Sequence, residues 1–523
     1  MEHHGAESYY VVGEGLLTES GGGRPRPLAP EVEAAAPPFR FSRLGPNGKG
    51  LQLGDITRQK LAEAMTTGAK DPSGRIPSGF TYLGQFIDHD LTADKTTVML
   101  GTDVSPDAMQ QGRSPVLDLD SLYGAGPGDP VSAQFYSDGL RLKMGTAIQP
   151  PLPNFDLPRV GKGSSKAARR KAQIPELRND ENLAVAQTHL AFIRFHNRVC
   201  DTLPKSTPPG QLFSRARRKV TKHYQWMIKT DFLPRIVDKA IVTDVFTNGR
   251  KVFEVGAAPT DMPTMPIEFS IAAYRLGHSM VRGAYNWNVN FDDGAGTLPL
   301  LFQFTGTSGD LGGELHLLQI WVADFRRLYN FGEAGREDLV VPAAKFNRAQ
   351  RIDTKLVNPL ADLPAGSIAG PAGPEGSDQR NLAYRNLTRA NMVSLATGQQ
   401  MVAFMRSKGV AVTQLSKGDI RNGKGGASLE GLTKKQRQRV VEDTPLWFYV
   451  LREAELNGGR MTGVGGRIVV ETMHRAMEGA TFSIVRDPQW RPQLGPDANT
   501  FRMVDLLLFA ANGKANIINP LGG

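Results

Sequence analysis

The chain has 523 residues, of which 40% are hydrophobic and 22% are charged. Both proportions are ordinary for globular proteins, so they exclude a wholly disordered, collagenous or membrane-embedded chain. The formal net charge of +10 is small for this length and only weakly indicates binding to nucleic acid or to anionic membranes.

Features that would direct the chain into a membrane or out of the cell are weak. The longest apolar run near the C-terminus covers residues 506–511, far short of the roughly 20 residues that span a bilayer, so we expect no transmembrane helix. Glu2 and Glu7 stand where a signal peptide is basic. The single cysteine, Cys200, permits no intrachain disulfide. The cytoplasm is therefore the default expectation, with export by a non-classical route left open.

Glycine, proline and alanine are abundant in residues 1–50, which predicts an N-terminal arm, either laid over a domain or loose, in which no core begins. Residues 51–523 are predicted to form a single large, mainly α-helical domain with little β-structure, because no linker separates two cores. Its long loops include Gly/Pro-rich segments at 366–376 and 423–426. Apolar residues at helical spacing predict helices near residues 59–66, 81–92, 181–203, 214–230, 267–281, 315–329, 380–395, 444–454 and 466–479.

The densest group of basic residues lies between residues 159 and 171. Glycine and serine interrupt it, and it contains no aromatic residue that could stack on a base. We therefore interpret it as a solvated loop in preference to a nucleic-acid site. Its members are Arg159, Lys162, Lys166, Arg169, Arg170 and Lys171.

The segment 84–92 brings polar residues to one face of a predicted helix. Gln85, Asp88 and His89 stand at positions i, i+3 and i+4, so an amide, a carboxylate and a possible general base share that face. Asp90 lies about 100° further round the helix and must contact something else. The alternative is an ordinary polar helix face, but a histidine that transfers protons near neutral pH would suit oxygen or acyl chemistry.

A second group precedes the longest predicted helix. Arg178 and Glu181 are three residues apart and can point together, and the helix dipole favours acidic residues at an N-terminus. Helix capping by Asn179 or Asp180 explains the segment fully by itself.

Oxygen-bearing side chains alternate in segment 114–124. Asp118 and Asp120 follow Ser114, and such spacing suits Ca²⁺, which takes six to eight oxygen ligands including backbone carbonyls. The segment is not an EF-hand, because the glycine at the sixth position and the glutamate at the twelfth are absent. A capped turn is the alternative.

A fourth feature is His278, which follows Gly277 in an otherwise apolar predicted helix. A lone histidine there is most often a hydrogen-bonded core residue, but the glycine lets a flat group approach the backbone. An imidazole that binds iron through one nitrogen needs an acceptor for the N–H of the other, which Asn386 could supply.

Together and in this order, the motifs resemble the animal-type haem peroxidase family over about residues 80–400. The resemblance implies a mainly α-helical fold that holds haem b and Ca²⁺, and the missing disulfides and signal peptide make the chain similar to bacterial members.

On the distal side of the haem, the resemblance implies that His89 is the base and that Gln85 lies beside it. Arg178 matches the distal arginine. Asp88 and Glu181 match the two carboxylates that form ester bonds to haem methyl groups in this family.

On the proximal side, the resemblance implies that His278 is the axial iron ligand and Asn386 its hydrogen-bonding partner. Arg275 and Arg389 match arginines that lie near the haem propionates. The calcium ligands implied are Asp90, the Ser114 hydroxyl, the Val116 carbonyl, Asp118 and Asp120.

The activity implied is that of a haem peroxidase, which reduces hydrogen peroxide and oxidises a small phenol-like or halide donor through a ferryl intermediate. His89 would move the peroxide proton, and Arg178 would stabilise charge as the O–O bond lengthens. Calcium would tie the loop at 114–120 to Asp90, so loss of the metal should displace the neighbouring His89.

Two departures from the family pattern narrow these expectations. Asn182 stands where some members have a methionine linked to the haem, so that bond should be missing. Arg275 stands where cyclooxygenases and α-dioxygenases have a radical tyrosine, which disfavours fatty-acid oxygenation. A fatty-acid dioxygenase, a non-catalytic haem- and calcium-bearing scaffold and a nucleic-acid-binding protein remain as alternatives. The electron donor, the oligomeric state and the formation of the ester bonds stay open.

Overall fold

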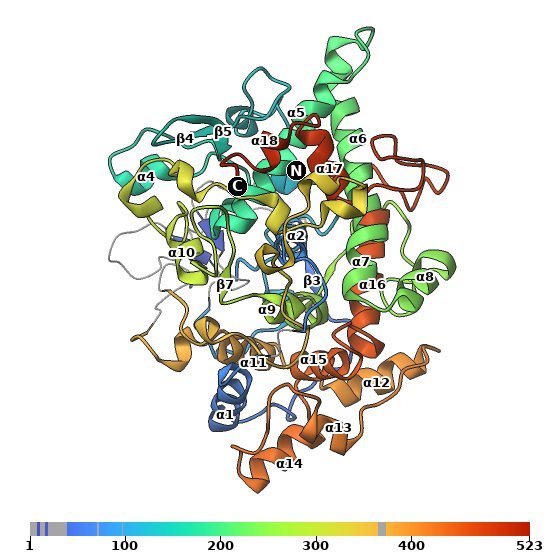
Figure 1. The fold of residues 1–523 in the computed structure, drawn as a ribbon. Coiled ribbons are helices and arrows are strands. Elements are labelled where there is room, and N and C mark those ends of the chain that lie inside the picture. The colour runs from blue at the N-terminus through green and yellow to red at the C-terminus, as the bar shows by residue number, and fades with distance from the viewer. Residues whose placement is uncertain (1–7, 11–15, 19–38, 71–72, 97, 365–372) are drawn as a thin grey trace.

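Helices joined by long connections make up most of the molecule (Figure 1). The computed structural model describes residues 8–10, 16–18, 39–70, 73–96, 98–364 and 373–523. The longer helices are α1 (Asp55–Thr66), α2 (Gly79–Leu91), α5 (Leu183–Asp201), α6 (Leu212–Met227), α8 (Lys239–Asn248), α11 (Leu382–Met392), α12 (Gly398–Ser407), α14 (Lys434–Glu442), α15 (Leu446–Leu456), α16 (Gly463–Gly479) and α17 (Met503–Ala510). The shorter helices are α3 (Asp120–Tyr123), α4 (Lys166–Arg170), α7 (Leu233–Ile236), α9 (Gly277–Met280), α10 (Leu298–Gln303), α13 (Lys417–Asn422) and α18 (Ala515–Ile518).

The strands of the described residues form short two-stranded pairs. The antiparallel pairs are β1 (Ser8–Tyr10) with β2 (Leu16–Thr18), β4 (Gly145–Ala147) with β5 (Leu152–Asp156), and β7 (Ala284–Tyr285) with β8 (Gly296–Thr297). The parallel pair is β3 (Phe41–Ser42) with β6 (Met265–Pro266). The mainly α-helical fold predicted from the sequence is confirmed.

The core around α2 is built from aromatic contacts with α5 and α6. Phe86 of α2 stacks on Phe192 of α5 with ring centroids 4.4 Å apart, and Tyr224 of α6 meets Phe86 edge-on. All three rings are fully buried. Because α2 is held on this apolar side, its polar face is directed towards the segment that contains α9, with which α2 is in contact.

Eight of the predicted helical regions contain helix, but the one predicted at 315–329 is wrong. Only short 3₁₀ turns lie there, at Gln319–Trp321 and Phe325–Arg327. The side chains of Trp287 and Asn288 donate hydrogen bonds to the carbonyls of residues 320–322, at 2.8 Å each. These carbonyls are therefore taken from any α-helical ladder, although the apolar spacing suits a helix.

The predicted helix at 267–281 is present in an irregular form. A π-helical turn at Glu268–Ala272 leads into a 3₁₀ turn at Ala273–Leu276 and then into α9. Glu268 accepts hydrogen bonds from the backbone N–H groups of Leu44 and Gly45, at 2.9 and 3.0 Å. The N-terminal region is thereby tied to the segment that carries His278.

The N-terminal arm predicted for residues 1–50 is only partly described, since residues 1–7, 11–15 and 19–38 lie outside the described part. Residues 39–50 lie over the helical domain, which is one of the two arrangements expected. The expectation that no core begins there is wrong, because Phe41 is buried and pairs with Met265. Of the glycine-rich loop at 366–376, residues 366–372 are likewise outside the described part.

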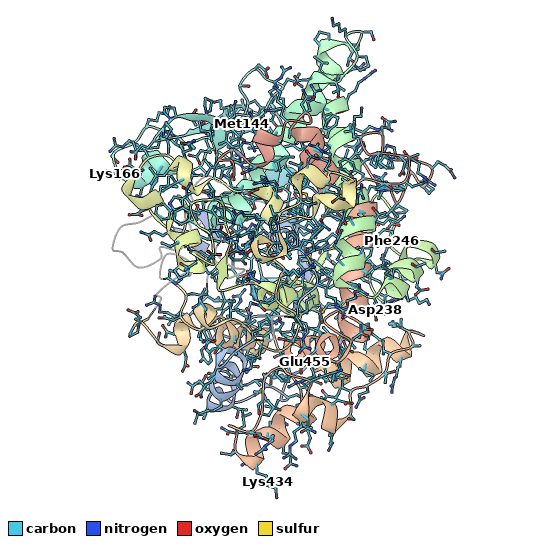
Figure 2. The ribbon with its side chains drawn as sticks, in the orientation of Figure 1. Met144, Lys166, Asp238, Phe246, Lys434 and Glu455 are labelled. Carbon is cyan, nitrogen blue, oxygen red and sulfur yellow. The ribbon has the colours of Figure 1, made fainter. Side chains whose placement is uncertain are left out.

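The basic segment at 159–171 is not a uniformly solvated loop. Arg159 forms buried ion pairs with Asp156, at 2.7 Å, and with Asp180. Ser165 caps the short helix α4, on which Lys166 projects from the edge of the molecule (Figure 2). The interpretation as a solvated segment holds for Lys166 and fails for Arg159. The spacing of residues in the sequence does not reveal that Arg159 is buried.

No helix among the described residues has both the length and the apolar character needed to cross a membrane.

Candidate active site

A buried cavity lies between α2 and the irregular segment that ends in α9. His89 and His278 both line it, together with Gln85, Asp88 and Arg178. The structure therefore brings together residues that are up to 193 positions apart, as the sequence analysis predicted for a single site. Apolar side chains form much of the wall, among them Phe41, Phe80, Phe232, Ile271, Leu276 and Phe302.

Hydrogen bonding fixes the tautomer of His89. Its Nδ1 lies 2.8 Å from Asn179 Oδ1, and the Nδ2 of Asn179 lies 2.9 Å from His189 Nδ1. A carbonyl oxygen only accepts, so His89 Nδ1 must carry the proton and Nε2 is left with a free lone pair. Burial, followed by the charge of Arg178, lowers the pKa of His89 to about 3. His89 is therefore a neutral proton acceptor at physiological pH.

Arg178 is buried against a carboxylate that the sequence analysis did not single out. Its Nε and Nη2 donate to Glu176 at 2.9 and 2.8 Å, and Nη2 also donates to the backbone carbonyl of His89 at 3.0 Å. Burial alone would raise the pKa of Glu176, but Arg178 and then Arg113 hold it well below its usual value. The site thus presents a fixed positive charge beside the neutral imidazole of His89.

Gln85 is held by two residues from the start of α5. Its Oε1 accepts a hydrogen bond from Asn182 Nδ2 at 2.9 Å, and its Nε2 donates to Glu181 Oε1. The same Glu181 oxygen lies 3.7 Å from His89 Nε2. Asn182 also caps α5 by accepting from the N–H of Val185, at 3.0 Å. Capping by Asn179 or Asp180, the alternative drawn from the sequence, is wrong, because Asn179 binds His89 and Asp180 binds Arg159.

The carboxylate of Asp88 lies at the cavity wall. Thr92 Oγ1 donates to it at 3.2 Å, and burial raises its pKa. A buried carboxyl group with a raised pKa is readily kept in its uncharged form.

His278, which also lines the cavity, contacts Asn386 with hydrogen-bond donor and acceptor roles reversed from those expected. Asn386 Nδ2 lies 2.9 Å from His278 Nδ1, so the amide donates and the imidazole accepts. The amide is oriented this way because Arg275 Nη1 donates to Asn386 Oδ1 at 2.6 Å. Burial, and then Arg275, lowers the pKa of His278 to about 3. The expected contact is present, but Asn386 is not an acceptor for His278.

The two arginines expected beside the propionates both line the cavity and have partners within the protein. Arg275 binds Asn386, and Arg389 forms an ion pair with Asp94. Beside them, the buried Oγ of Ser270 has no hydrogen-bond partner in the described part of the chain.

Asp90 points away from the cavity towards the loop at 114–121. It accepts from Ser121 Oγ at 2.6 Å and from the N–H of Leu119 at 3.3 Å. Burial, and then the charges of Asp120 and Asp118, raises the pKa of Asp90 well above its usual value. Three acidic side chains therefore lie near one another, although in the described residues no such group is close enough to hold a metal as it stands.

Two arginines contact the other acids of this loop. Arg217 lies 3.3 Å from Asp118, and Arg113 lies 3.3 Å from Asp120. Asp118 Oδ1 is nevertheless buried without a hydrogen-bond partner among the described residues, and burial raises the pKa of Asp118 to about 6. The carbonyl of Val116 accepts from the N–H of Asp118 at 3.1 Å, and Ser114 is buried nearby in sequence. Among the described residues, Asp118 Oδ1 is the one buried side-chain oxygen of this loop left without a partner, and it would suit a hard cation, although arginines contact both Asp118 and Asp120.

Sequence reasoning missed Glu176, Asn179, Asn182 and His189 as site residues. Asn179 and Glu176 flank the predicted Arg178, so proximity in sequence to that residue is the feature that could have found them. His189 lies on the buried side of α5 and gives no such indication.

A family model described as animal haem peroxidase matches residues 93–308, a range that contains Arg178 and His278 and begins just after His89. A peroxidase-like protein of Margaritifera margaritifera is 32% identical over 126 residues, which are 24% of this chain and 15% of that relative. Among the curated relatives, the matched stretches span 15% to 21% of the relative's own length.

Solved structures resemble most of the chain. Peroxidase A from Dictyostelium discoideum has a TM-score of 0.57 at 15% identity and covers 92% of this chain and 94% of its own. The fatty acid alpha-dioxygenase of Oryza sativa has a TM-score of 0.53 at 11% identity, covering 88% of this chain and 77% of its own. At these identities the likeness shows the fold alone.

Proposed function

We propose that the chain, which matches the animal haem peroxidase family over residues 93–308, is a haem-dependent peroxidase that reduces hydrogen peroxide and oxidises a small organic donor. The observation that carries the proposal is that His89 and His278 line one buried cavity, with His89 Nε2 free to accept a proton. Arg178 lies beside His89 as a fixed cation. This is the set of groups that peroxide cleavage requires.

The residues of the cavity fit a haem. Gly277 lines it, and a Cβ atom placed on Gly277 would meet no atom within 4 Å, so the backbone faces open space. The largely apolar walls suit a porphyrin, and Ser270 Oγ offers an unused polar atom at its edge. When bound, the haem supplies the redox chemistry.

Within this proposal, each predicted residue has a defined task towards the haem. His278 would bind the iron through Nε2, which requires its proton to move to Nδ1 and the Asn386 amide to turn so that Oδ1 accepts that proton. Asp88 and Glu181 would hold the macrocycle through ester bonds. Arg275 and Arg389 would turn from Asn386 and Asp94 towards the propionates.

His89 moves the proton. Nε2 would accept a proton from one oxygen of hydrogen peroxide and return it to the other, which would leave as water, while the haem would supply the two electrons that cleavage of the O–O bond requires. General acid–base catalysis of this kind is worth about 10² to 10⁴ in rate. The low pKa of His89 keeps the ring neutral and ready to accept throughout the physiological pH range.

Arg178 stabilises the negative charge that develops as the O–O bond lengthens. Fixed donors of this type commonly contribute roughly 3–4 kcal/mol to transition-state stabilisation. Its guanidinium cannot lose its proton at working pH, so its contribution does not depend on pH.

The donor is a small phenol-like molecule in preference to a halide. Gln85, the residue expected to hold a halide, already donates one of its two amide N–H groups to Glu181, which leaves one for a halide. An aromatic molecule suits the apolar wall.

A fatty-acid dioxygenase is the alternative within the same fold. Against it, Arg275 occupies the position expected for a radical tyrosine, and its guanidinium binds Asn386. Oxygen uptake with a free fatty acid in the absence of peroxide would favour this alternative. A haem-bearing scaffold without activity is the other, and it would bind haem but leave added peroxide unconsumed.

The test compares wild type with His89→Ala after loading with haem. We expect an absorption spectrum of bound haem in both proteins and a reaction with peroxide slower by at least about 10² in the variant. His474→Ala, which truncates a buried histidine that does not line the cavity, is the control and should react at the wild-type rate. Equal rates in wild type and His89→Ala would reject His89 as the base.

A further inference from the structure

We propose that Glu176 and Arg113 are positioning residues that hold Arg178 in the active site and connect it to the loop at 114–121. The inference rests on the proposed function, since it concerns the residue that stabilises charge there. Neither Glu176 nor Arg113 lines the cavity formed by the described residues, whereas Arg178 does.

Glu176 fixes Arg178 through both its backbone and its side chain. Glu176 Oε1 accepts from the backbone N–H of Arg178 at 3.0 Å and from its Nε at 2.9 Å, while Oε2 accepts from Nη2 at 2.8 Å. The two parallel side-chain bonds form the bidentate pair that gives an arginine a single orientation. The third bond caps the 3₁₀ turn Leu177–Asp180, so the backbone of Arg178 cannot turn independently.

The guanidinium of Arg178 also contacts the backbone of His89, the proposed base. The Nη2 that binds Glu176 Oε2 donates to the carbonyl oxygen of His89 at 3.0 Å. One carboxylate therefore sets the position of the guanidinium relative to both the cavity and the backbone of His89.

Arg113 provides a second cation on the same carboxylate. Its Nη2 donates to Glu176 Oε2, and its Nη1 lies 3.3 Å from Asp120 Oδ1. Arg113, Glu176 and Arg178 have exposed fractions of 1%, 5% and 1%. The series Asp120–Arg113–Glu176–Arg178, of which Asp120 is partly exposed, thus alternates in charge from the loop to the cavity.

Removing the charge of Glu176 would leave two buried guanidinium groups facing each other. Charges of the same sign repel strongly where water is excluded. Arg178 is the one that borders the cavity, so it would shift on that side and out of line with the peroxide. Misplacement by about 1 Å can cost up to about 10² in rate.

The experiment uses Glu176→Gln, which keeps the shape of the side chain and removes its charge. In the haem-loaded protein we expect the rate constant for reaction with peroxide to fall between about 10-fold and 10²-fold. The affinity of the ferric haem for fluoride, an anion that Arg178 would also stabilise, should fall in parallel. The KM for an aromatic donor should not change, since Glu176 does not touch the cavity.

Glu455→Gln is the matched control. Glu455 forms an equally buried pair with Arg452, 2.6 Å apart, on α15 and away from the cavity lining (Figure 2). It should lower the midpoint of thermal unfolding as Glu176→Gln does, while peroxide reactivity and fluoride affinity stay at wild-type values. Glu176→Asp, which retains the charge, should react with peroxide faster than Glu176→Gln and more slowly than wild type. If Glu176→Gln does not fold, Glu176→Asp replaces it in the comparison with Glu455→Gln.

Arg178→Gln separates the two proposals. If Arg178→Gln slows the peroxide reaction and Glu176→Gln behaves like Glu455→Gln, the positioning role is wrong and the proposed function stands. If Arg178→Gln itself leaves peroxide reactivity and fluoride affinity unchanged, the role of Arg178 in the proposed function is wrong, and the positioning role falls with it.

Discussion

At His89, the bond from Nδ1 to Asn179 Oδ1 leaves Nε2 facing the cavity as an acceptor. Asn179 is itself oriented by His189, whose Nδ1 accepts from the amide nitrogen at 2.9 Å. All three side chains are buried, so no water competes for these bonds. The reactivity of the base is therefore set by an amide outside the cavity, as second-layer partners set the tautomers of other functional histidines.

Asn179 variants should change the pH dependence of the peroxide reaction. In wild type the His89 pKa of about 3 predicts a rate that is flat from pH 8 to about pH 5 and declines only on further acidification. Asn179→Asp places a carboxylate against Nδ1, which stabilises the imidazolium and raises the His89 pKa, so the decline should begin at higher pH. Asn179→Leu removes the acceptor and should lower the rate about 10-fold at all pH values. The measurement is stopped-flow mixing with peroxide across this range, and superimposable profiles would show that Asn179 does not control His89.

Individual side chains of the site were predictable from the sequence only where they belong to a motif with a recognisable spacing. His89, Arg178 and His278 stand in recognisable spacings, and the structure places all three at one cavity. The polarity of the Asn386 contact was not predictable, because it depends on Arg275, which is 111 residues away in the chain. The direction of the bond between Asn386 and His278 is set by Arg275, and residue spacing in the sequence does not reveal that contact.

At the scale of elements, apolar spacing predicted helices correctly in segments whose backbone groups bond mainly to one another. The region 315–329 had the same spacing, yet it is irregular because Trp287 and Asn288 donate to its carbonyls. The segment with His278 is broken for a related reason, since Glu268 binds the backbone of the N-terminal region. Both cases are tertiary contacts that outweigh local propensity.

The loop at 114–121 is the element whose metal dependence can be tested. We propose that Ca²⁺ binds between Asp90 and Asp118, because Asp118 Oδ1 is buried without a partner among the described residues. Burial and the charge of Asp120 also raise the pKa values of both carboxyl groups, and a cation would relieve that repulsion. Chelation should then lower peroxide reactivity before the protein unfolds, since Asp90 adjoins His89. Asp118→Asn should weaken calcium binding by at least about 10-fold. The measurements are metal content by mass spectrometry, thermal unfolding and peroxide rate on one sample. Full activity in folded protein that holds no calcium would contradict the link.

At the scale of the whole molecule, one core extends from Phe41 to Ile518 and joins the N-terminal region, the helices and the C-terminal segment. Length and composition predicted such a core, but they did not indicate which polar groups it would enclose. Buried histidines are prominent among these, and burial lowers the pKa of His189 to about 3 and of His196 and His223 to about 4. Because each is neutral when folded, the molecule as a whole should be sensitive to acid.

His223 does not line the cavity, so the effect of histidine protonation on stability can be tested there separately from activity. Its Nε2 accepts from the N–H groups of Gln493 and Leu494, at 3.0 and 3.2 Å, and its Nδ1 donates to the carbonyl of Lys219 at 2.6 Å. Protonation would turn the accepting nitrogen into a donor and break both bonds to the C-terminal segment. An unfolded histidine has a pKa of about 6.5, so between pH 6.5 and 4 the unfolded chain binds more protons than the folded one.

The contribution of His223 to the free energy of unfolding should therefore be complete above pH 6.5 and be lost as the pH is lowered towards 4, amounting to at most about 3 kcal/mol. His223→Gln keeps an acceptor and a donor but does not titrate, so its decline should be shallower by up to about 1.4 kcal/mol per pH unit in this window. Other buried groups, including Glu453 with its raised pKa of about 8, are common to both proteins and cancel in the difference. Urea unfolding of both proteins at pH 7, 6, 5 and 4 measures this difference in the free energy of unfolding. If that free energy changes with pH in parallel in wild type and His223→Gln, the folded protein tolerates a protonated His223.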